Sequence, residues 1–398
     1  MMNGLSLDLK SRAVANPFES LFAFRRPLKI AGLGDSIMAG DGQPSGQARV
    51  GSWLPKGSIY TDGRLVPLVY GYGGLTAIGH RSQSYRNDFL EANPDLVIYH
   101  LGHNDLPGTG GSLTVTQRNN LRSAITATIQ EAIAAGAKVI VPELVPLAGI
   151  SVSERDSHNA WLASLPDAIP GVVFMPGIAG LYDPSLTINT PDGTHPNQVG
   201  SGKLARFFAD WISPLLSGVR QFRELVLEAG LAGVTLKRDP IALPFQTGVG
   251  GGYPATSSET LNGSRVVIDI SGDGNQIVTW IGGSTGSFAN KWFLASFRLK
   301  ANLISPAPAR VFSVDASTDG QGFATFFEGQ LDTLGNWGHV ICLRKGSASA
   351  THHIVRAVAG ELVATDVNSP AQIEIGEMYF HDLNAMVAAN PGVNWNMP

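Results

Sequence analysis

The chain has 398 residues, enough for two domains, and 43% of its residues are hydrophobic while 15% are charged. Its formal net charge of −4 provides no strong positive field, so we expect neither a nucleic-acid partner nor a membrane partner. The single cysteine, Cys342, excludes an internal disulfide, and no apolar run reaches the ~18 residues that a membrane span needs.

Residues 1–26 mix polar, charged and aromatic side chains without a sustained period, and we interpret them as an N-terminal arm. Charged residues interrupt this stretch, so it lacks the continuous apolar core of a secretory signal.

From residue 27 to about 217, apolar runs alternate with amphipathic stretches. The predicted strands are Leu28–Leu33, Leu65–Tyr70, Leu96–Leu101, Lys138–Val145 and Val172–Met175. The predicted helices are Ala77–Glu91, Thr114–Ala135, Glu154–Leu165 and Val199–Leu216. This alternation predicts a parallel sheet covered by helices on both faces, with all strand carboxyl ends at one edge.

Residues Ala39–Gly63 depart from the alternation because they are rich in Gly, Pro, Ser and Gln. We interpret them as a long loop over the sheet edge, where a substrate would bind. The alternative is an insertion without a role.

Residues 218–262 include a short helical piece, Gln221–Glu228, and a glycine-rich run, and we interpret them as a linker. Short strand-like segments separated by turn signals then fill residues 263–398. They are Arg265–Ile270, Gln276–Ile281, Trp292–Leu299, Ala309–Asp315, Phe323–Glu328, His339–Arg344, His353–Ala359 and Gln372–Asp382. Strands at this spacing predict an antiparallel β-sandwich of jelly-roll type.

Polar and glycine residues collect in four places at the predicted edge of the parallel sheet. Asp35-Ser36 follows the first strand and Gly71–Thr76 the second. Gly102–Asp105 follows the third strand, and Asp192–Pro196 precedes the last helix. Ligands of open α/β sheets bind at this edge, so Ser36 is a candidate nucleophile. Taken alone, Gly-Asp-Ser favours an ordinary turn over a nucleophile.

Asp192 and His195 stand three residues apart, a spacing at which a carboxylate in a turn can accept a hydrogen bond from the imidazole Nδ1–H. Such a bond fixes the tautomer and leaves Nε2 free to act as a base. The alternative is an Asx-type turn that caps the following helix.

Together these segments resemble the SGNH (GDSL) hydrolase superfamily. Gly34-Asp35-Ser36 matches its first block and Gly74-Leu75-Thr76 its glycine block. Gly102–Asp105 matches the Gly-x-Asn-Asp block, and Asp192–Pro196 the terminal Asp-x-x-His-Pro block. The order and the strand–helix contexts agree, and the resemblance covers residues 28 to about 217.

The resemblance implies a three-layer α/β/α sandwich with a five-stranded parallel sheet in flavodoxin-like order. It implies Ser36 as nucleophile, His195 as base and Asp192 as the orienting carboxylate. The oxyanion hole would consist of the backbone N–H groups of Ser36 and Gly74 with the Asn104 side chain. Ester hydrolysis of this kind requires no cofactor and no metal.

Two features depart from the family pattern. Val69 stands where members often carry an asparagine, five residues before the oxyanion glycine, and the insertion Ala39–Gly63 is longer than usual. Neither touches the predicted triad, and both bear on substrate preference.

Other motifs have simpler interpretations. Gly282–Gly286 fits the Gly-x-Ser-x-Gly elbow, but no helical pattern follows, so we predict a hairpin turn. His103 is interpreted as structural support and His158 as a surface or packing histidine. His352-His353 lacks metal-site spacing, and Asp269 with Asp273 lacks the ligand count of a calcium site.

A β-sandwich beside an esterase resembles the arrangement of carbohydrate-active enzymes, which predicts removal of O-acetyl groups from a polysaccharide. Aromatic residues that could stack on sugars are Trp280, Trp292, Trp337 and Tyr379, with a core position the simpler alternative for each.

The layout also resembles bacteriophage tail-spike esterases, which implies a homotrimer and an extracellular or virion-associated location, with a cytoplasmic location as the alternative. Two other functions stay open: a lipase or thioesterase acting on acyl chains, and a non-catalytic carbohydrate-binding protein.

Overall fold

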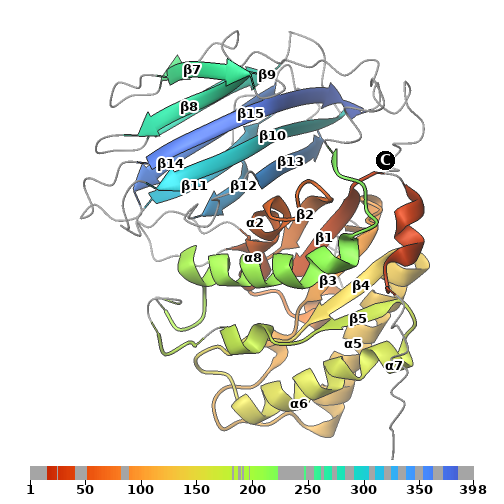
Figure 1. Cartoon of the computed structure of the whole chain (residues 1–398). Coiled ribbons are helices and arrows are strands. Elements are labelled where there is room, and N and C mark those ends of the chain that lie inside the picture. Colours follow the sequence, from red (N-terminus) through yellow and green to blue (C-terminus); the bar gives the residue numbers. More distant parts are fainter. Residues whose placement is uncertain are drawn as a thin grey trace, which may run out of the picture.

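The computed structural model describes residues 16–24, 26–40, 52–81, 89–181, 183–186, 190, 192–196 and 198–222, together with the strands of the C-terminal third between residues 246 and 383. Residues 16–222 are called the α/β part below, and the strands from residue 246 onward the C-terminal sheets. Figure 1 shows the α/β part below the C-terminal sheets.

The α/β part is built on a five-stranded parallel sheet in the order β2-β1-β3-β4-β5. Its strands are β1 (Leu28–Gly34), β2 (Leu65–Gly71), β3 (Leu96–His100), β4 (Lys138–Pro142) and β5 (Val172–Met175). Every residue of β1 and β3 is buried, as expected for a sheet covered on both faces. The predicted parallel sheet and its flavodoxin-like order are confirmed.

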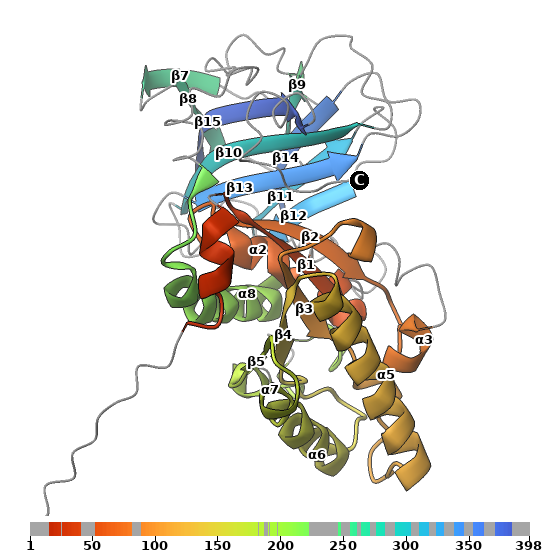
Figure 2. The same cartoon turned by 90° about the vertical axis from the view of Figure 1, so that its right-hand side faces the viewer.

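Helices cover both faces of this sheet, as the two views show (Figures 1 and 2). One core cluster joins the sheet to α1 (Ser36–Ala39), α2 (Trp53–Ile59) and α8 (Gln198–Ile212). The other joins it to α3 (Ala77–His80), α5 (Val115–Ala134), α6 (Val152–Ala163) and α7 (Leu165–Ala168). The predicted α/β/α layers are therefore present.

Short 3₁₀ turns complete this part: η1 (Glu19–Phe24), η2 (His103–Asp105), η3 (Ile178–Leu181) and η4 (Ser213–Leu216). The end of the predicted N-terminal arm is fastened to the core through η1. Phe18, just before η1, is fully buried, and Asn16 donates a hydrogen bond of 2.9 Å to the carbonyl oxygen of Leu215.

The prediction that Ala39–Gly63 is one long loop is wrong for its second half. Trp53–Ile59 forms α2, in which every residue is buried, and residues 41–51 lie outside the described part of the chain. Ser52 caps the helix by accepting a hydrogen bond from the Leu54 N–H, and Pro55 lies in the first turn. First-turn N–H groups have no intrahelical acceptor, so proline is tolerated there.

A second difference concerns the helix predicted over Ala77–Glu91. Helix α3 ends at His80, and residues 82–88 lie outside the described part. Residues 89–91 are helical again. The predicted piece Gln221–Glu228 lies outside the described residues from position 223 onward.

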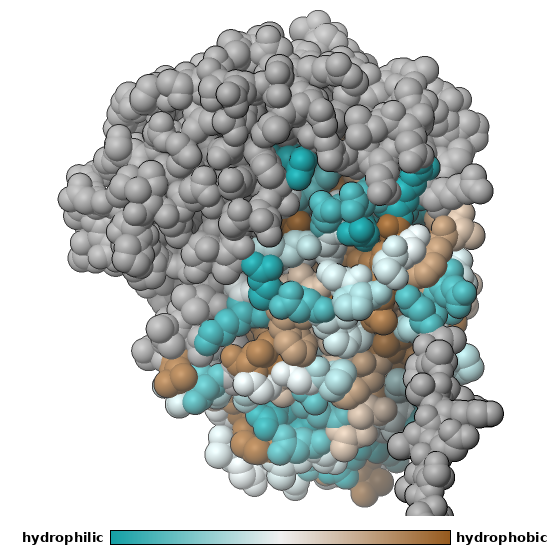
Figure 3. Space-filling model, viewed as in Figure 1, coloured by the Kyte–Doolittle hydropathy of each residue, from teal (hydrophilic) through white to brown (hydrophobic). Residues whose placement is uncertain are grey.

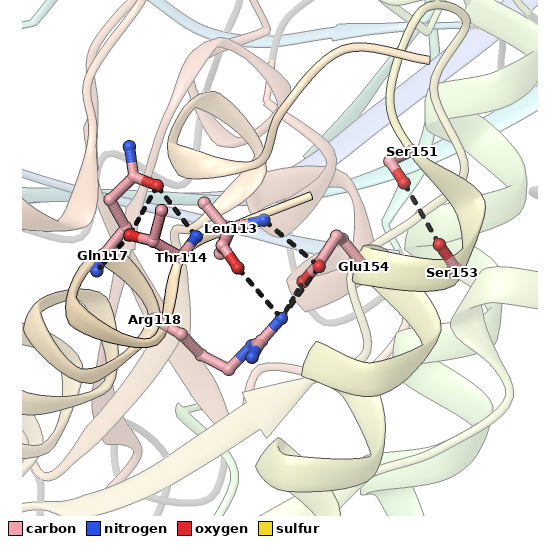
Figure 4. Close-up of polar contacts among 7 residues, drawn as sticks. All are labelled: Leu113, Thr114, Gln117, Arg118, Ser151, Ser153 and Glu154. Atoms are coloured by element: carbon pink, nitrogen blue, oxygen red, sulfur yellow. Dashed lines mark hydrogen bonds and ion pairs between the residues drawn. The ribbon is translucent and has the colours of Figure 1, made fainter. Parts of the chain in front are cut away.

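Helix α5 begins with a capping box in which Thr114 and Gln117 exchange side-chain and backbone hydrogen bonds (Figure 4). One turn later, Arg118 Nη2 donates to both carboxylate oxygens of Glu154 on α6, at 2.8 and 3.0 Å. Glu154 also accepts a hydrogen bond from the N–H of Leu113, so one carboxylate ties α6 to the start of α5.

The C-terminal sheets are two five-stranded antiparallel sheets, in the orders β13-β10-β15-β8-β7 and β12-β11-β14-β9-β6. The strands are β6 (Gln246–Thr247), β7 (Ala255–Thr260), β8 (Ser264–Ile270), β9 (Gln276–Gly282), β10 (Trp292–Leu303), β11 (Arg310–Ser317), β12 (Ala324–Gly329), β13 (Gly338–Lys345), β14 (His353–Glu361) and β15 (Ala371–Asp382).

Strands β6 and β7 fall inside the predicted linker, residues 218–262, which is a correction to the predicted boundary. They were missed because β6 has two residues and β7 is rich in Ser and Thr, so neither has a hydrophobic alternation. The other strands agree with the predicted segments within a few residues.

The C-terminal sheets contact the α/β part through β13, which lies against β2 and α2, and through β12, which lies against α2 and α8. His339 on β13 is buried and packs edge-on against Phe222, with ring centroids 5.7 Å apart. Gly63 has a φ of 72°, and a Cβ there would lie 2.8 Å from His339 Nδ1, so only glycine fits this approach.

Hydrophilic and hydrophobic residues interleave over the face of the α/β part in Figure 3. Among the residues that the structure describes, no helix is both long and apolar enough to cross a membrane.

Candidate active site

The end of β1 places Ser36 at the carboxyl edge of the sheet. Asp35 follows the strand, and its carboxylate caps α1 by accepting a 2.9 Å hydrogen bond from the N–H of Ile37. A Cβ at Gly34 would lie 2.2 Å from Met38 Cβ, so the sharp turn into α1 requires glycine. Ser36 is the first residue of α1.

A hydroxyl, an imidazole and a carboxylate stand in series at this edge. Ser36 Oγ lies 3.0 Å from His195 Nε2, and His195 Nδ1 lies 2.7 Å from Asp192 Oδ2. Because an ionised carboxylate only accepts, Nδ1 carries the proton and Nε2 is left to accept from the serine hydroxyl. This arrangement can remove a proton from Ser36.

The charged form of Asp192 is favoured at this position. Partial burial opposes ionisation, but hydrogen bonds from the His195 ring and from the backbone N–H groups of His195 and Thr194 lower the pKa of Asp192 below its ordinary value. The two N–H groups donate to Asp192 Oδ1 at 2.7 and 2.9 Å. The carboxylate thereby shapes the turn that carries His195 as well as orienting its ring.

The loop after β4 holds the turn that carries Asp192 and His195. The N–H of Ala148 donates a 2.7 Å hydrogen bond to the carbonyl oxygen of Gly193. Gly193 has a φ of 75°, and a Cβ there would lie 2.7 Å from the Ala148 side chain. The same loop forms an isolated bridge from Ile150 to Gly108, near η2.

Of the three predicted oxyanion donors, Ser36 begins α1, and Gly74 and Asn104 lie on two neighbouring loops. Gly74 is exposed with a φ of 71° and has no atom within 4 Å of a Cβ position. Asn104 is exposed, and its Nδ2 donates a 3.0 Å hydrogen bond to the carbonyl oxygen of Leu75. An amide nitrogen carries two hydrogens, so the second one stays available to a ligand.

Asp105, next to Asn104, holds the start of α3. Its Oδ2 accepts a 2.7 Å hydrogen bond from the N–H of Ala77. Burial raises the pKa of the Asp105 carboxyl above its ordinary value, although this backbone bond opposes the shift.

Sequence reasoning missed a second Asp–His pair beneath Ser36. His103 Nδ1 lies 2.8 Å from Asp35 Oδ2, and both side chains are only 1% exposed. Burial disfavours the charged carboxylate, but the imidazole of His103 outweighs it and lowers the pKa of Asp35 below its ordinary value. The two residues are distant in sequence, so no local spacing signals their contact.

The structure describes only some of the other residues that the sequence analysis named. His158 is buried and not at the surface, and burial lowers its pKa to about 3. The side chain of Trp292 is partly buried. Residues 283–286 of the second Gly-Ser-Gly motif lie outside the described part of the structure. So do the side chains of the other candidates, which are Trp280, Trp337, Tyr379, His352, His353, Asp269, Asp273 and Cys342. No group of three or more potential metal ligands occurs among the described residues.

A parallel α/β sheet with hydrogen-bonded serine, histidine and aspartate side chains at its carboxyl edge is the architecture of a hydrolase. Residues 33–202 match the model of the GDSL-like Lipase/Acylhydrolase family. This match covers less than half of the chain, and over residues 33–202 it supports an esterase of the SGNH hydrolase superfamily.

Several solved structures are similar to the chain at low sequence identity. A lipase/acylhydrolase from Enterococcus faecalis is 21% identical over 47% of this chain and 96% of its own, with a TM-score of 0.35. A carbohydrate esterase family 3 protein from Talaromyces cellulolyticus is 18% identical over 48% and 99%, with a TM-score of 0.38. A two-domain esterase active on acetylated mannans is 15% identical over 90% and 94%, with a TM-score of 0.33. No curated protein matches the sequence.

Proposed function

We propose that the protein is a serine esterase that removes O-acetyl groups from a polysaccharide through an acyl-enzyme. The observation that supports it most directly is the unbroken series from Ser36 Oγ to His195 and on to Asp192, with contacts of 3.0 and 2.7 Å. These distances allow proton transfer without rearrangement of the site.

In the proposed first step, Ser36 Oγ attacks the ester carbonyl carbon while His195 Nε2 takes the hydroxyl proton. The tetrahedral intermediate collapses, and the alcohol leaves with the proton that His195 returns. Water then attacks the acyl-enzyme, with His195 as base, and releases acetate. Asp192 holds the imidazole in one tautomer and stabilises its positive charge during both steps.

The proposed oxyanion hole consists of the backbone N–H groups of Ser36 and Gly74 with the Asn104 amide. Each donor of this kind contributes ~3 kcal/mol to stabilisation of the transition state. The positive φ of Gly74 and the free hydrogen of the Asn104 amide are compatible with this role.

The nucleophile is tested by Ser36→Ala, for which we expect hydrolysis of p-nitrophenyl acetate to fall by ~10³-fold or more. The matched control is Ser284→Ala, in the second Gly-Ser-Gly motif, which should keep the wild-type rate. A fluorophosphonate should label Ser36 in the wild type. Near-normal turnover in Ser36→Ala would remove Ser36 from this role.

The polysaccharide part of the proposal rests on the layout, in which two antiparallel sheets follow the esterase fold and contact it through β13. We propose that these sheets form a jelly-roll sandwich, a separate domain that binds the glycan or joins subunits. Acetate release from a panel of acetylated glycans tests the substrate class. Failure on every glycan, with activity on p-nitrophenyl acetate, would leave an esterase of another substrate class.

A lipase or thioesterase is the second candidate, because the family includes enzymes that act on acyl chains. Comparing p-nitrophenyl acetate with the octanoate and dodecanoate esters separates the two. A preference for the long esters would contradict deacetylation. A carbohydrate-binding protein without activity is the third candidate, and absence of fluorophosphonate labelling would support it.

The tail-spike version of the proposal further requires a homotrimer outside the cell or on a virion. Light scattering of the full chain tests the assembly, and a monomer would contradict this version. The esterase proposal itself does not depend on the outcome.

A further inference from the structure

We propose that His103 is a positioning residue for ester hydrolysis, which joins the nucleophile turn to the loop that carries the Asn104 amide. This inference rests on the proposed function. It concerns a side chain that lies beneath the reacting atoms and does not touch the substrate.

The first observation is the way Asp35 is used. One carboxylate oxygen, Oδ1, accepts the N–H of Ile37 at 2.9 Å and so fixes the first turn of α1, whose first residue is Ser36. The other oxygen, Oδ2, accepts from His103 Nδ1 at 2.8 Å. The orientation of the turn that presents Ser36 therefore depends on the carboxylate that His103 holds.

The second observation is that the ring of His103 is itself fixed. His100 packs edge-on against it, with ring centroids 5.0 Å apart and an interplanar angle of 88°. Behind His100 lies the indole of Trp53 from α2, at 6.1 Å. Burial lowers the pKa of His100 to about 3, so this neighbour is neutral and adds no competing charge at neutral pH.

The third observation is that each side chain of η2 bonds to a different element. His103 holds the nucleophile turn, Asn104 donates to the carbonyl oxygen of Leu75 in the glycine loop, and Asp105 accepts from the N–H of Ala77. Three consecutive side chains thus join three elements of the site. Loss of the His103 bond would let the Ser36 N–H and the Asn104 amide move relative to each other.

Such a displacement lowers the rate of the chemical step more than it weakens substrate binding, because the oxyanion exists only after the attack. The expected signature is therefore a lower kcat with an unchanged KM. A residue that served stability alone would lower the melting temperature without this signature.

The test compares His103→Asn with His103→Gln in the full chain, using p-nitrophenyl acetate. The amide nitrogen of Asn occupies the place of Nδ1 and can still donate to Asp35, whereas that of Gln reaches toward the place of Nε2. We expect His103→Asn to keep kcat within about threefold of the wild type. We expect His103→Gln to lower kcat by at least about tenfold, with KM changed less than about twofold.

The matched control is His158→Gln, which changes another buried histidine beside Gly102 and leaves the Asp35–His103 bond in place, and which should keep the wild-type kcat. Melting temperatures of all three variants separate folding losses from rate losses. Equal kcat values for the Asn and Gln variants, or a loss confined to KM, would overturn the inference while leaving the esterase intact. Absence of turnover in the wild type would overturn the proposed function instead.

Discussion

Buried titratable side chains of the α/β part occupy both ends of the parallel strands, and their environments differ. At the carboxyl edge, Asp35 has a hydrogen-bonding imidazole and stays charged more readily than an ordinary aspartate. At the opposite end, Asp95 accepts two hydrogen bonds from Arg26 and one from the N–H of Lys29. The Asp35–His103 pair lies below the proposed nucleophile, whereas the hydrogen bonds of Asp95 join the starts of β1 and β3.

Lys29 allows a prediction of pH dependence. Its side chain is fully buried, and burial lowers its pKa from 10.5 to about 8, against the opposing effect of Asp95. Between these two pKa values the unfolded chain binds more protons than the folded chain, so stability rises with pH in this window. Between pH 8 and pH 9.5 we expect a gain of about 2 kcal/mol from this residue.

Urea denaturation across this range should show the rise in the wild type, and Lys29→Met should abolish it. Lys203→Met, at an exposed position on α8, is the control and should keep the wild-type slope. A Lys29→Met variant with an unchanged slope would mean that Lys29 does not cause the pH dependence.

Helix α2 is an element that the sequence pattern does not predict. Its Pro55 and Gly57 resemble loop residues, yet proline is tolerated in a first turn and the glycine permits close packing on α8. A Cβ at Gly57 would lie 2.6 Å from Phe208 and 2.9 Å from the carbonyl oxygen of Ala205. The residue that argues against a helix in the sequence is therefore the one that lets two helices meet.

We expect Gly57→Ala to destabilise the protein by about 1–3 kcal/mol, because overpacking outweighs the gain in helix propensity. Gly202, on α8, has no atom within 4 Å of a Cβ position, so Gly202→Ala should stabilise by about 0.5–1 kcal/mol. Chemical denaturation of the two variants measures both changes in the free energy of unfolding. Stabilisation by Gly57→Ala would show that α2 and α8 are less tightly packed than described.

At the scale of the whole molecule, the important feature is the contact between β13 and the α/β part. Phe222 is fully buried against His339, and the N–H of Phe222 donates a 3.0 Å hydrogen bond to the carbonyl oxygen of Gly63. His339 Nε2 in turn lies 2.5 Å from the hydroxyl of Ser296 on β10. This buried contact between β13 and residues Gly63 and Phe222 predicts that the α/β part and the C-terminal sheets unfold together.

We expect Phe222→Ala to cost about 3–5 kcal/mol and to split a single calorimetric transition into two. The control is Phe24→Ala, since Phe24 is 39% exposed and its loss should change stability little. Two transitions already present in the wild type would show that this contact does not couple unfolding of the α/β part to unfolding of the C-terminal sheets.

The sequence by itself determined the parallel sheet and the four segments at its edge, while the strand order came from the resemblance to the SGNH superfamily. It could do so because buried strands, amphipathic helices and glycine turns leave local patterns, and because the family blocks fix the order of Ser36, Asn104 and His195. Parallel topology then places these segments at one edge of the sheet, because the carboxyl ends of all the strands lie there.

Only the tertiary structure decided which side chains touch across long sequence separations. The Asp35–His103 bond, the approach of Gly57 to Phe208 and the pairing of the short strands β6 and β7 leave no periodic signal. In each case the deciding term is a contact between elements far apart in the chain, where close packing or burial outweighs local propensity. Such contacts become visible only when the whole chain is folded.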